Sequence, residues 1–91
     1  MDMTMSGRNA LVSGASKGIG FAISRSFALA GANVAMVARR ARVLEEAKAV
    51  IAKVAPKARL VCVAGDVAKS EDCTRIFAAA EKGLGSGPRL M

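Results

Sequence analysis

Hydrophobic residues in this chain occur in two arrangements that alternate along its length. Short continuous runs, such as Asn33–Ala38, have the length and apolar character of strands that are buried on both faces. Between these runs, apolar residues recur at intervals of three and four, as on one face of a helix. The pattern predicts strands at Gly7–Ser13, Asn33–Ala38 and Arg59–Ala64, and helices at Ile19–Ala30, Arg42–Val54 and Ser70–Lys82.

Residues at the helix ends agree with these boundaries. Gly31 is placed to end the first helix in the left-handed conformation, and Pro56 stops the second helix. Ser70 is expected to cap the third helix, which has acidic residues in its first turn. For the first helix, the spacing predicts a core face and a more polar opposite face. The core face is Ile19, Ala22, Ile23, Phe27 and Ala30, and the opposite face is Ser24, Arg25 and Ser26.

Alternating strands and helices are typical of half of a doubly wound α/β fold. The prediction is therefore a partial Rossmann-type parallel sheet, βαβαβα, with right-handed crossovers and the strand order 3-2-1. That order leaves the first strand without a partner on its far side, because the glycine-rich stretch 83–91 is interpreted as irregular rather than as a fourth strand. We expect a flexible tail at 1–6, one folded domain at 7–82 and an irregular end at 83–91.

Composition narrows the class of protein further. A hydrophobic fraction of 53% argues against a disordered chain, and 91 residues allow one small domain. The net charge of +7 invites a nucleic-acid interpretation, but the basic residues are scattered and no aromatic stacking platform accompanies them. We therefore rank nucleic-acid binding last and expect most of these charges to lie on solvated helix faces.

Location and metal content can also be predicted. No run approaches the length of a membrane span, and the first residues lack the features of a signal peptide, so a cytoplasmic protein without membrane association is expected. Cys62 and Cys73 have neither the spacing nor the histidine partners of a metal site. We predict that both are buried, reduced thiols and that the chain binds no metal.

Glycines cluster between the first predicted strand and the first predicted helix. The stretch reads Ser13-Gly14-Ala15-Ser16-Lys17-Gly18-Ile19-Gly20. Gly14 would allow a sharp exit from the strand, Gly18 would open the helix, and Gly20 would let the first helical turn lie close to the strand. Unpaired N–H groups at such a helix start attract a pyrophosphate. An ordinary glycine turn is the alternative, and the strands and helix in the right order argue against it.

This stretch resembles the cofactor loop of the short-chain dehydrogenase/reductase family, whose pattern is Thr-Gly-x-x-x-Gly-x-Gly. Ser13 stands where the family usually has threonine and keeps the hydroxyl group. The resemblance extends from about Gly7 to about Lys82. It implies that residues 7–82 form part of an NAD(P)-binding domain and that Ser13, Gly14, Ser16, Lys17, Gly18, Ile19 and Gly20 contact the cofactor.

The residues after the second strand bear on which cofactor binds. NAD-binding sites place a carboxylate at the end of that strand, where this chain has Ala38 followed by Arg39 and Arg40. Members of the family that prefer NADP carry a basic residue before the middle glycine and another after the second strand, and Lys17 and Arg39 match these positions. Arg40 could assist or replace Arg39. We predict NADP rather than NAD, the alternative being ordinary loop charges.

Asp66 and Val67 follow the third strand, where the family receives the adenine ring. The resemblance implies that the Asp66 carboxylate accepts from the adenine amine and that the Val67 N–H donates to the ring. A solvated aspartate that caps the next helix is the competing interpretation.

Catalysis is not expected from this chain alone. The family uses a Tyr-x-x-x-Lys pair with a serine and an Asn-Asn-Ala-Gly segment, whereas this chain has no tyrosine, no histidine and only two separate asparagines. We therefore name no catalytic residue and interpret the chain as the amino-terminal, NADP(H)-binding part of a truncated oxidoreductase that acts on a carbonyl or alcohol. A non-catalytic module that binds a nucleotide or a partner is the alternative, and dimerisation stays open.

Overall fold

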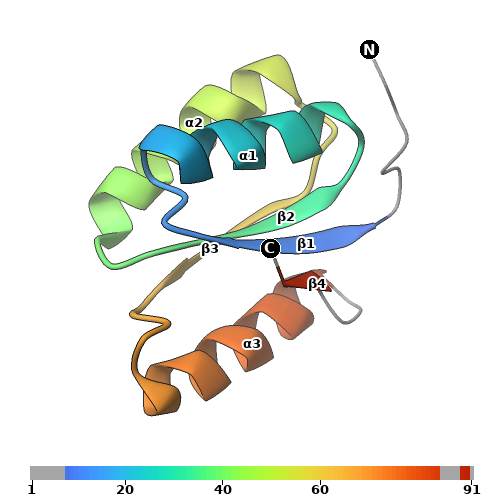
Figure 1. The fold of residues 1–91 in the computed structure, drawn as a ribbon. Helices are drawn as coiled ribbons and strands as arrows, with labels where there is room; N and C mark the ends of the chain where they lie inside the picture. Colours follow the sequence, from blue (N-terminus) through green and yellow to red (C-terminus); the bar gives the residue numbers. More distant parts are fainter. Residues whose placement is uncertain (1–7, 85–88, 91) are drawn as a thin grey trace.

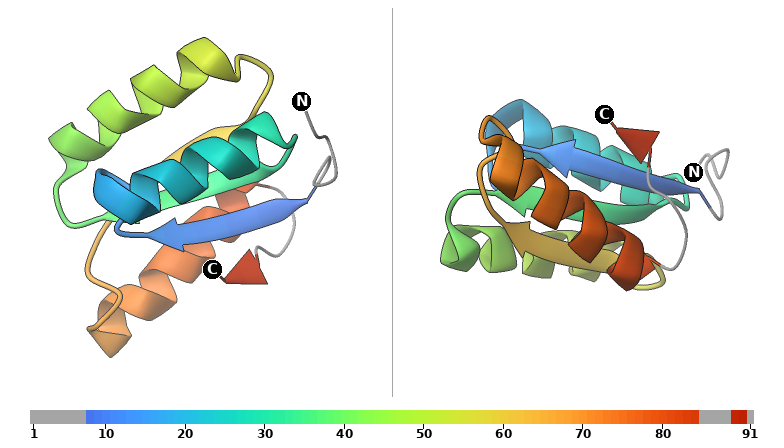
Figure 2. Two further views of the ribbon diagram at one scale, coloured as in Figure 1. Left: turned by 45° about the horizontal axis from the view of Figure 1, so that its top comes forward. Right: turned by 90° about the horizontal axis from the view of Figure 1, so that it is seen from below.

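A parallel β-sheet lies between two layers of helices in the computed structural model, which describes residues 8–84 and 89–90 (Figure 1). The strands are β1 (Asn9–Ser13), β2 (Asn33–Ala38), β3 (Leu60–Ala64) and β4 (Arg89–Leu90). The helices are α1 (Gly18–Leu29), α2 (Ala41–Val54) and α3 (Ser70–Leu84). Helices α1 and α2 cover one face of the sheet and α3 covers the other (Figure 2). The predicted partial Rossmann-type fold is confirmed.

The sheet has the order β3-β2-β1-β4, which contains the predicted order 3-2-1 and adds one strand. The prediction of an irregular stretch without a fourth strand was wrong for Arg89 and Leu90, which pair in parallel with Ala10 and Leu11 of β1. Helix α3 runs back along the sheet and returns the chain to the amino ends of the strands (Figure 2). A parallel neighbour for β1 can begin from there. The predicted tail at 1–6 lies outside the described residues.

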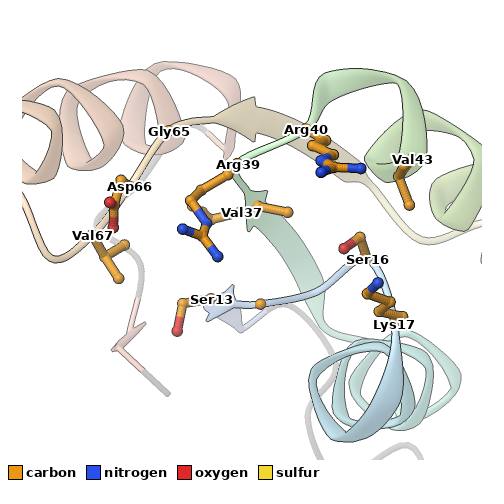
Figure 3. Close-up of a pocket in the computed structure, with 12 residues that line it drawn as sticks. Ser13, Ser16, Lys17, Val37, Arg39, Arg40, Val43, Gly65, Asp66 and Val67 are labelled. Atoms are coloured by element: carbon orange, nitrogen blue, oxygen red, sulfur yellow. The ribbon is translucent and has the colours of Figure 1, made fainter.

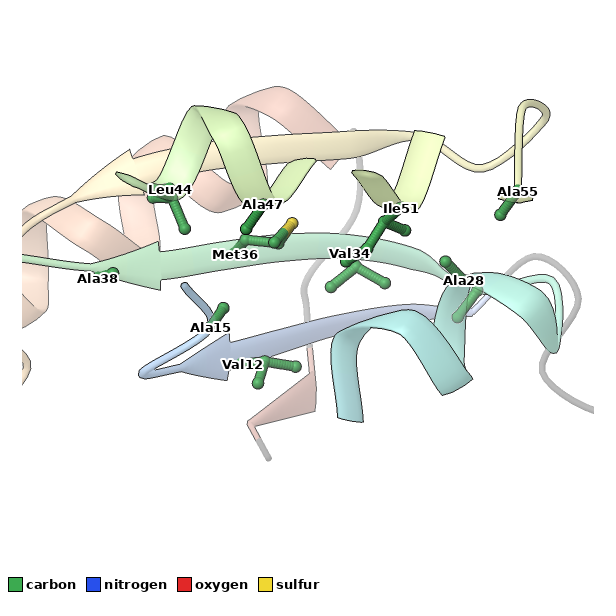
Figure 4. Close-up of a cluster of buried hydrophobic side chains, with 11 residues drawn as sticks. Val12, Ala15, Ala28, Val34, Met36, Ala38, Leu44, Ala47, Ile51 and Ala55 are labelled. Carbon is green, nitrogen blue, oxygen red and sulfur yellow. The ribbon is translucent and has the colours of Figure 1, made fainter. Parts of the chain in front are cut away.

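Strand β2 forms the centre of the hydrophobic core. Its side chains alternate, so that Val34 and Met36 pack toward α1 and α2 (Figure 4), whereas Ala35 and Val37 pack toward α3. These four residues are at most 1% exposed. A strand with a helical layer on each side buries both of its faces, which explains the unbroken apolar run in its sequence.

Helices α2 and α3 bury the faces that their spacing predicts, except that Val54, the last residue of α2, is 42% exposed. The buried residues of α2 are Leu44, Ala47 and Ile51, and those of α3 are Ile76, Ala80 and Leu84. Ser70, however, is the first residue of α3 and not its cap. The Cys73 N–H donates to the Lys69 carbonyl over 2.8 Å, which places the cap at Lys69.

Helix α1 presents only part of the predicted face to the core, because Phe27 packs against it but Ile19 and Ile23 do not. Its fully buried residues are Ser24 and Ala28, whereas Ile19 is 81% exposed and Ile23 is 37% exposed. The Ser24 hydroxyl donates to the Gly20 carbonyl over 2.9 Å, so its polar group is satisfied inside the helix. The small residues Gly20, Ser24 and Ala28 follow one another at intervals of four and allow α1 to approach the sheet closely.

Two further features concern glycine and cysteine. Gly31 has φ of 97°, which confirms the predicted left-handed end of α1. Cys62 and Cys73 are both free thiols, but each is only partly buried, so the prediction of buried thiols was wrong in this respect.

None of the helices among residues 8–84 and 89–90 has the length and apolar character that a membrane-spanning segment needs.

Candidate functional site

An open groove of about 700 Å³ lies where the carboxyl ends of β1, β2 and β3 meet (Figure 3). Each strand contributes the residues at its end and in the turn that follows. The lining residues are Ser13, Gly14, Ser16, Lys17, Val37, Ala38, Arg39, Arg40, Val43, Gly65, Asp66 and Val67. In open parallel sheets, ligands bind in the crevice outside the carboxyl ends of the strands, and this groove has that position.

The turn between β1 and α1 is shaped by glycine. Gly14 and Gly18 both have φ of 64°, in the left-handed region that an L side chain rarely adopts. The Ala15 N–H donates to the Val37 carbonyl over 3.0 Å and fixes the turn against the end of β2. The backbone of the turn is therefore open to the groove and held in one conformation.

The amino ends of α1 and α2 both lie at this groove, and no capping or acidic side chain of their first turns neutralises their partial positive charge. Lys17 and Arg40 occupy the N-cap positions, and neither side chain caps its helix. Neither helix has an acidic residue in its first turn, whereas α3 has Glu71 and Asp72 there. Because a helix start carries partial positive charge, both ends favour an anion in the groove.

Three cationic side chains surround the same space. Lys17, Arg39 and Arg40 are exposed at the groove, and Arg39 extends from the end of β2 toward Ser13 in Figure 3. The ion pairs of the described residues join Arg42 to Glu46 and Arg75 to Asp72, so the cations of the groove are not paired. Asp66 is the acidic residue in the lining. The arrangement suits a ligand with several negative charges.

Asp66 and Val67 form the opposite wall, in the turn between β3 and α3. One oxygen of the Asp66 carboxylate accepts from the Ala68 N–H over 3.0 Å, and the Asp66 carbonyl accepts from the Lys69 N–H over 3.0 Å. The side chain therefore stabilises the turn. It does not cap α3, because the cap lies at Lys69. It also lines the groove.

The structure brings most of the predicted site residues together. Eight line the groove: Ser13, Gly14, Ser16, Lys17, Arg39, Arg40, Asp66 and Val67. Gly18, Ile19 and Gly20 are outside its lining and form the start of α1, and the Ile19 side chain is exposed to solvent.

Four lining residues, Val37, Ala38, Val43 and Gly65, were not predicted as site residues. Ala38 was recognised only as the end of the second strand, where NAD-binding sites have a carboxylate. Val37 pairs with Ser13 in the parallel register, so knowledge of the register would have placed it in the groove. Val43 follows Arg40 by three residues and lies on the same side of the first turn of α2. Gly65 directly precedes Asp66 in the chain.

Comparison with known proteins identifies a family. The family model described as short chain dehydrogenase matches residues 8–87. Farnesol dehydrogenase from Aedes aegypti is 46% identical over 79 residues, which cover 87% of this chain and 32% of that protein.

Solved structures agree with this result. L-sorbose reductase from Gluconobacter frateurii, in complex with NADPH and L-sorbose, is 36% identical with a TM-score of 0.88, and the match covers 99% of this chain and 34% of that one. A short-chain type dehydrogenase/reductase from Mycobacterium marinum is 32% identical with a TM-score of 0.82, over 89% of this chain and 31% of that one. The chain thus spans about a third of the length of these relatives. Its sequence and its fold show that it belongs to the short-chain dehydrogenase/reductase family.

Proposed function

We propose that this chain binds NADP(H) in the groove and is the amino-terminal, cofactor-binding part of an oxidoreductase that transfers hydride between the cofactor and a carbonyl or alcohol. The observation that carries the proposal is the convergence of two uncapped helix starts with the unpaired cations Lys17, Arg39 and Arg40. NADP(H) has a pyrophosphate and a 2′-phosphate, and both need positive partners.

The positions of the helix start and of the three cations suggest which of them would bind each phosphate of NADP(H). The pyrophosphate would bind the backbone of the glycine turn at the start of α1, from Ser13 to Gly20, with Ser16 at its side. The 2′-phosphate would bind Arg39, Arg40 and Lys17. Ala38 ends β2 where a carboxylate would hold the ribose hydroxyls of NAD, and no acidic side chain would repel the phosphate there.

The adenine ring would bind at Asp66 and Val67, which line the groove beyond Arg39 (Figure 3). The cofactor supplies the hydride when bound. The proton transfer that accompanies it would come from residues beyond these 91, because the sequence contains neither tyrosine nor histidine. The NADPH complex of the similar L-sorbose reductase supports the choice of cofactor.

Equilibrium titration tests the proposal. The purified chain is titrated with NADPH and NADH, and binding is followed by cofactor fluorescence and by calorimetry. We expect NADPH to bind about ten- to hundredfold more tightly than NADH, the range that charge-assisted bonds to one phosphate supply. Competition by adenosine 2′,5′-bisphosphate should be stronger than competition by adenosine 5′-phosphate. Equal affinity for the two dinucleotides would overturn the choice of NADP, and a folded chain that binds neither would overturn the proposed function.

A further inference from the structure

Two side chains behind the groove hold the turn that carries Asp66 and Val67. The Asp72 carboxylate accepts from the Asp66 N–H over 3.0 Å. The Arg75 guanidinium donates to the Ala64 carbonyl over 2.8 Å and lies 3.7 Å from the other oxygen of Asp72. Both side chains come from the first turns of α3 and reach back to the end of β3. Neither lines the groove.

The backbone N–H groups of this turn are used almost completely within the chain. Gly65 donates to the Ala38 carbonyl over 2.9 Å, Asp66 donates to Asp72, and Ala68 and Lys69 donate to Asp66. Val67 is the exception, because its N–H has no partner among the described residues. The turn therefore offers one free backbone donor, and it offers it at the wall of the groove.

Close packing at Gly65 fixes the position of Arg75. A Cβ atom at Gly65 would lie 2.6 Å from a terminal nitrogen of Arg75 and 2.9 Å from the Cδ1 atom of Ile76. Ile76 is fully buried in the core between α3 and the sheet. The guanidinium thus rests directly on the backbone of the turn, and the turn is connected to the rigid part of the molecule.

We propose that Asp72 and Arg75 are positioning residues for the recognition of the adenine base, an inference that rests on the proposed function. With the Asp66 N–H held by Asp72, the turn presents to a ligand the Asp66 carboxylate as acceptor and the Val67 N–H as donor. This pair complements an exocyclic amine next to a ring nitrogen acceptor, which is the edge that adenine offers. Without Asp72, the Asp66 N–H becomes a second donor and the peptide group before Asp66 loses the bond that fixes its orientation, so the pair loses its fixed geometry.

The experiment compares NADPH with its deamino analogue, in which hypoxanthine replaces adenine and the amine is absent. The wild-type chain should prefer NADPH about tenfold, since a site built around the amine loses its partner in the analogue. In Asp72→Ala this preference should fall to within about twofold, while the affinity for the deamino analogue changes little. Asp72→Asn keeps an acceptor oxygen and should retain most of the preference. Glu71→Ala is the matched control, because Glu71 is an exposed acid in the same helical turn with no hydrogen bond or ion pair among the described residues.

The outcomes separate the two proposals. A purely structural role for Asp72 would weaken both ligands equally, and that result, or an unchanged preference in Asp72→Ala, would overturn the inference alone. A folded wild-type chain that binds neither ligand would overturn the proposed function together with the inference. If Asp72→Ala does not fold, Arg75→Ala tests the same turn, because the Arg75 side chain is 53% exposed and outside the core. It should also lose most of the preference for NADPH, and an unchanged preference there would equally overturn the inference.

Discussion

Gly20, in the first turn of α1, lies directly against the carbonyl group of Gly14, the first residue after β1. A Cβ atom at Gly20 would be 2.6 Å from the Gly14 carbonyl carbon, a distance that real side chains do not tolerate. Gly14 and Gly18, in contrast, have open space where a Cβ would lie, and their constraint is a φ of 64°. The glycines of one motif thus satisfy two separate physical requirements.

Gly20→Ala should destabilise the chain although alanine favours a helix. Helix α1 must move away from β1 to make room, and overpacking of this kind costs about 1–3 kcal/mol. Equilibrium unfolding in urea measures the loss. Gly14→Ala, which meets no atom but must adopt the left-handed conformation, is the comparison and should cost about 1–2 kcal/mol. A Gly20→Ala chain as stable as the wild type would show that α1 is not in tight contact with the strand.

Periodicity predicted most of the fold because the sheet is covered on both sides. Strand β2 has the predicted bounds, Asn33–Ala38, since a strand between two helical layers must be apolar throughout. Helix α1 was predicted less well. Its tight approach at Gly20 turns the small residues inward, and Ser24 satisfies its own hydroxyl through Gly20. A rule that seeks large apolar residues cannot detect a face of small residues.

The eight groove residues that were predicted follow from the motif and the strand ends, whereas Val37 and the support behind the turn depend on strand register and tertiary contacts. The motif placed Gly14 and Lys17, and the strand ends placed Arg39 and Asp66. The contact of Asp72 with the Asp66 N–H joins two residues six apart through a turn, and no sequence pattern indicates it. The two-residue strand β4 was also missed, because Arg89 and Leu90 are too short a run to predict a strand.

On helix α1, the effects of substitution on stability should be the reverse of what its hydrophobic pattern predicts. Ser24→Leu introduces a larger side chain at a position with 0% exposure, so it should cost about 1–3 kcal/mol of stability. Ile23→Gln changes an exposed position and should alter the free energy of unfolding by about 0.5 kcal/mol or less. Both are measured by urea unfolding at equal protein concentration. A stabilising Ser24→Leu would contradict the observed orientation of the helix.

Arg39→Ala should weaken NADPH binding about ten- to hundredfold and leave NADH binding nearly unchanged, since the guanidinium would contact only the 2′-phosphate. Arg42→Ala is the matched control. Arg42 is three residues further along, 93% exposed and paired with Glu46 over 3.8 Å, away from the groove lining. Titrations with both dinucleotides at two salt concentrations measure the effect. An equal loss of NADH and NADPH affinity in Arg39→Ala would argue for a nonspecific charge effect.

Cys62 should react slowly with thiol reagents. Burial, together with the nearby Glu45 carboxylate, raises the pKa of Cys62 to about 11 from an ordinary value of 9.0. At pH 8 its thiolate fraction is then about a hundredfold below that of an unperturbed thiol, and thiolate is the reactive form. Reaction with a chromogenic disulfide reagent, followed in Cys62→Ala and Cys73→Ala variants, should assign the faster phase to Cys73. A fast phase that survives in Cys73→Ala would contradict the protected environment of Cys62.

The hydrogen bond from the Asp66 N–H to the Asp72 carboxylate, which holds the turn, should be lost only in acid. The hydrogen bond from the Asp66 backbone, together with the charges of Arg75 and Lys69, holds the pKa of Asp72 below its ordinary value of 3.8, against a smaller opposing effect of burial. A carboxyl whose pKa is lower in the folded than in the unfolded chain contributes stability that is complete above the unfolded pKa and is lost as the pH falls through the folded pKa.

The amide resonance of Asp66, followed by NMR from pH 7 downward, should therefore hold its position until below pH 3.8 and then shift as Asp72 takes up its proton. Asp72→Asn, which removes the titrating group at position 72, is the necessary control. In that variant the step that belongs to position 72 should disappear. A midpoint above 3.8, or the same step in Asp72→Asn, would mean that the carboxylate of Asp72 does not hold the turn.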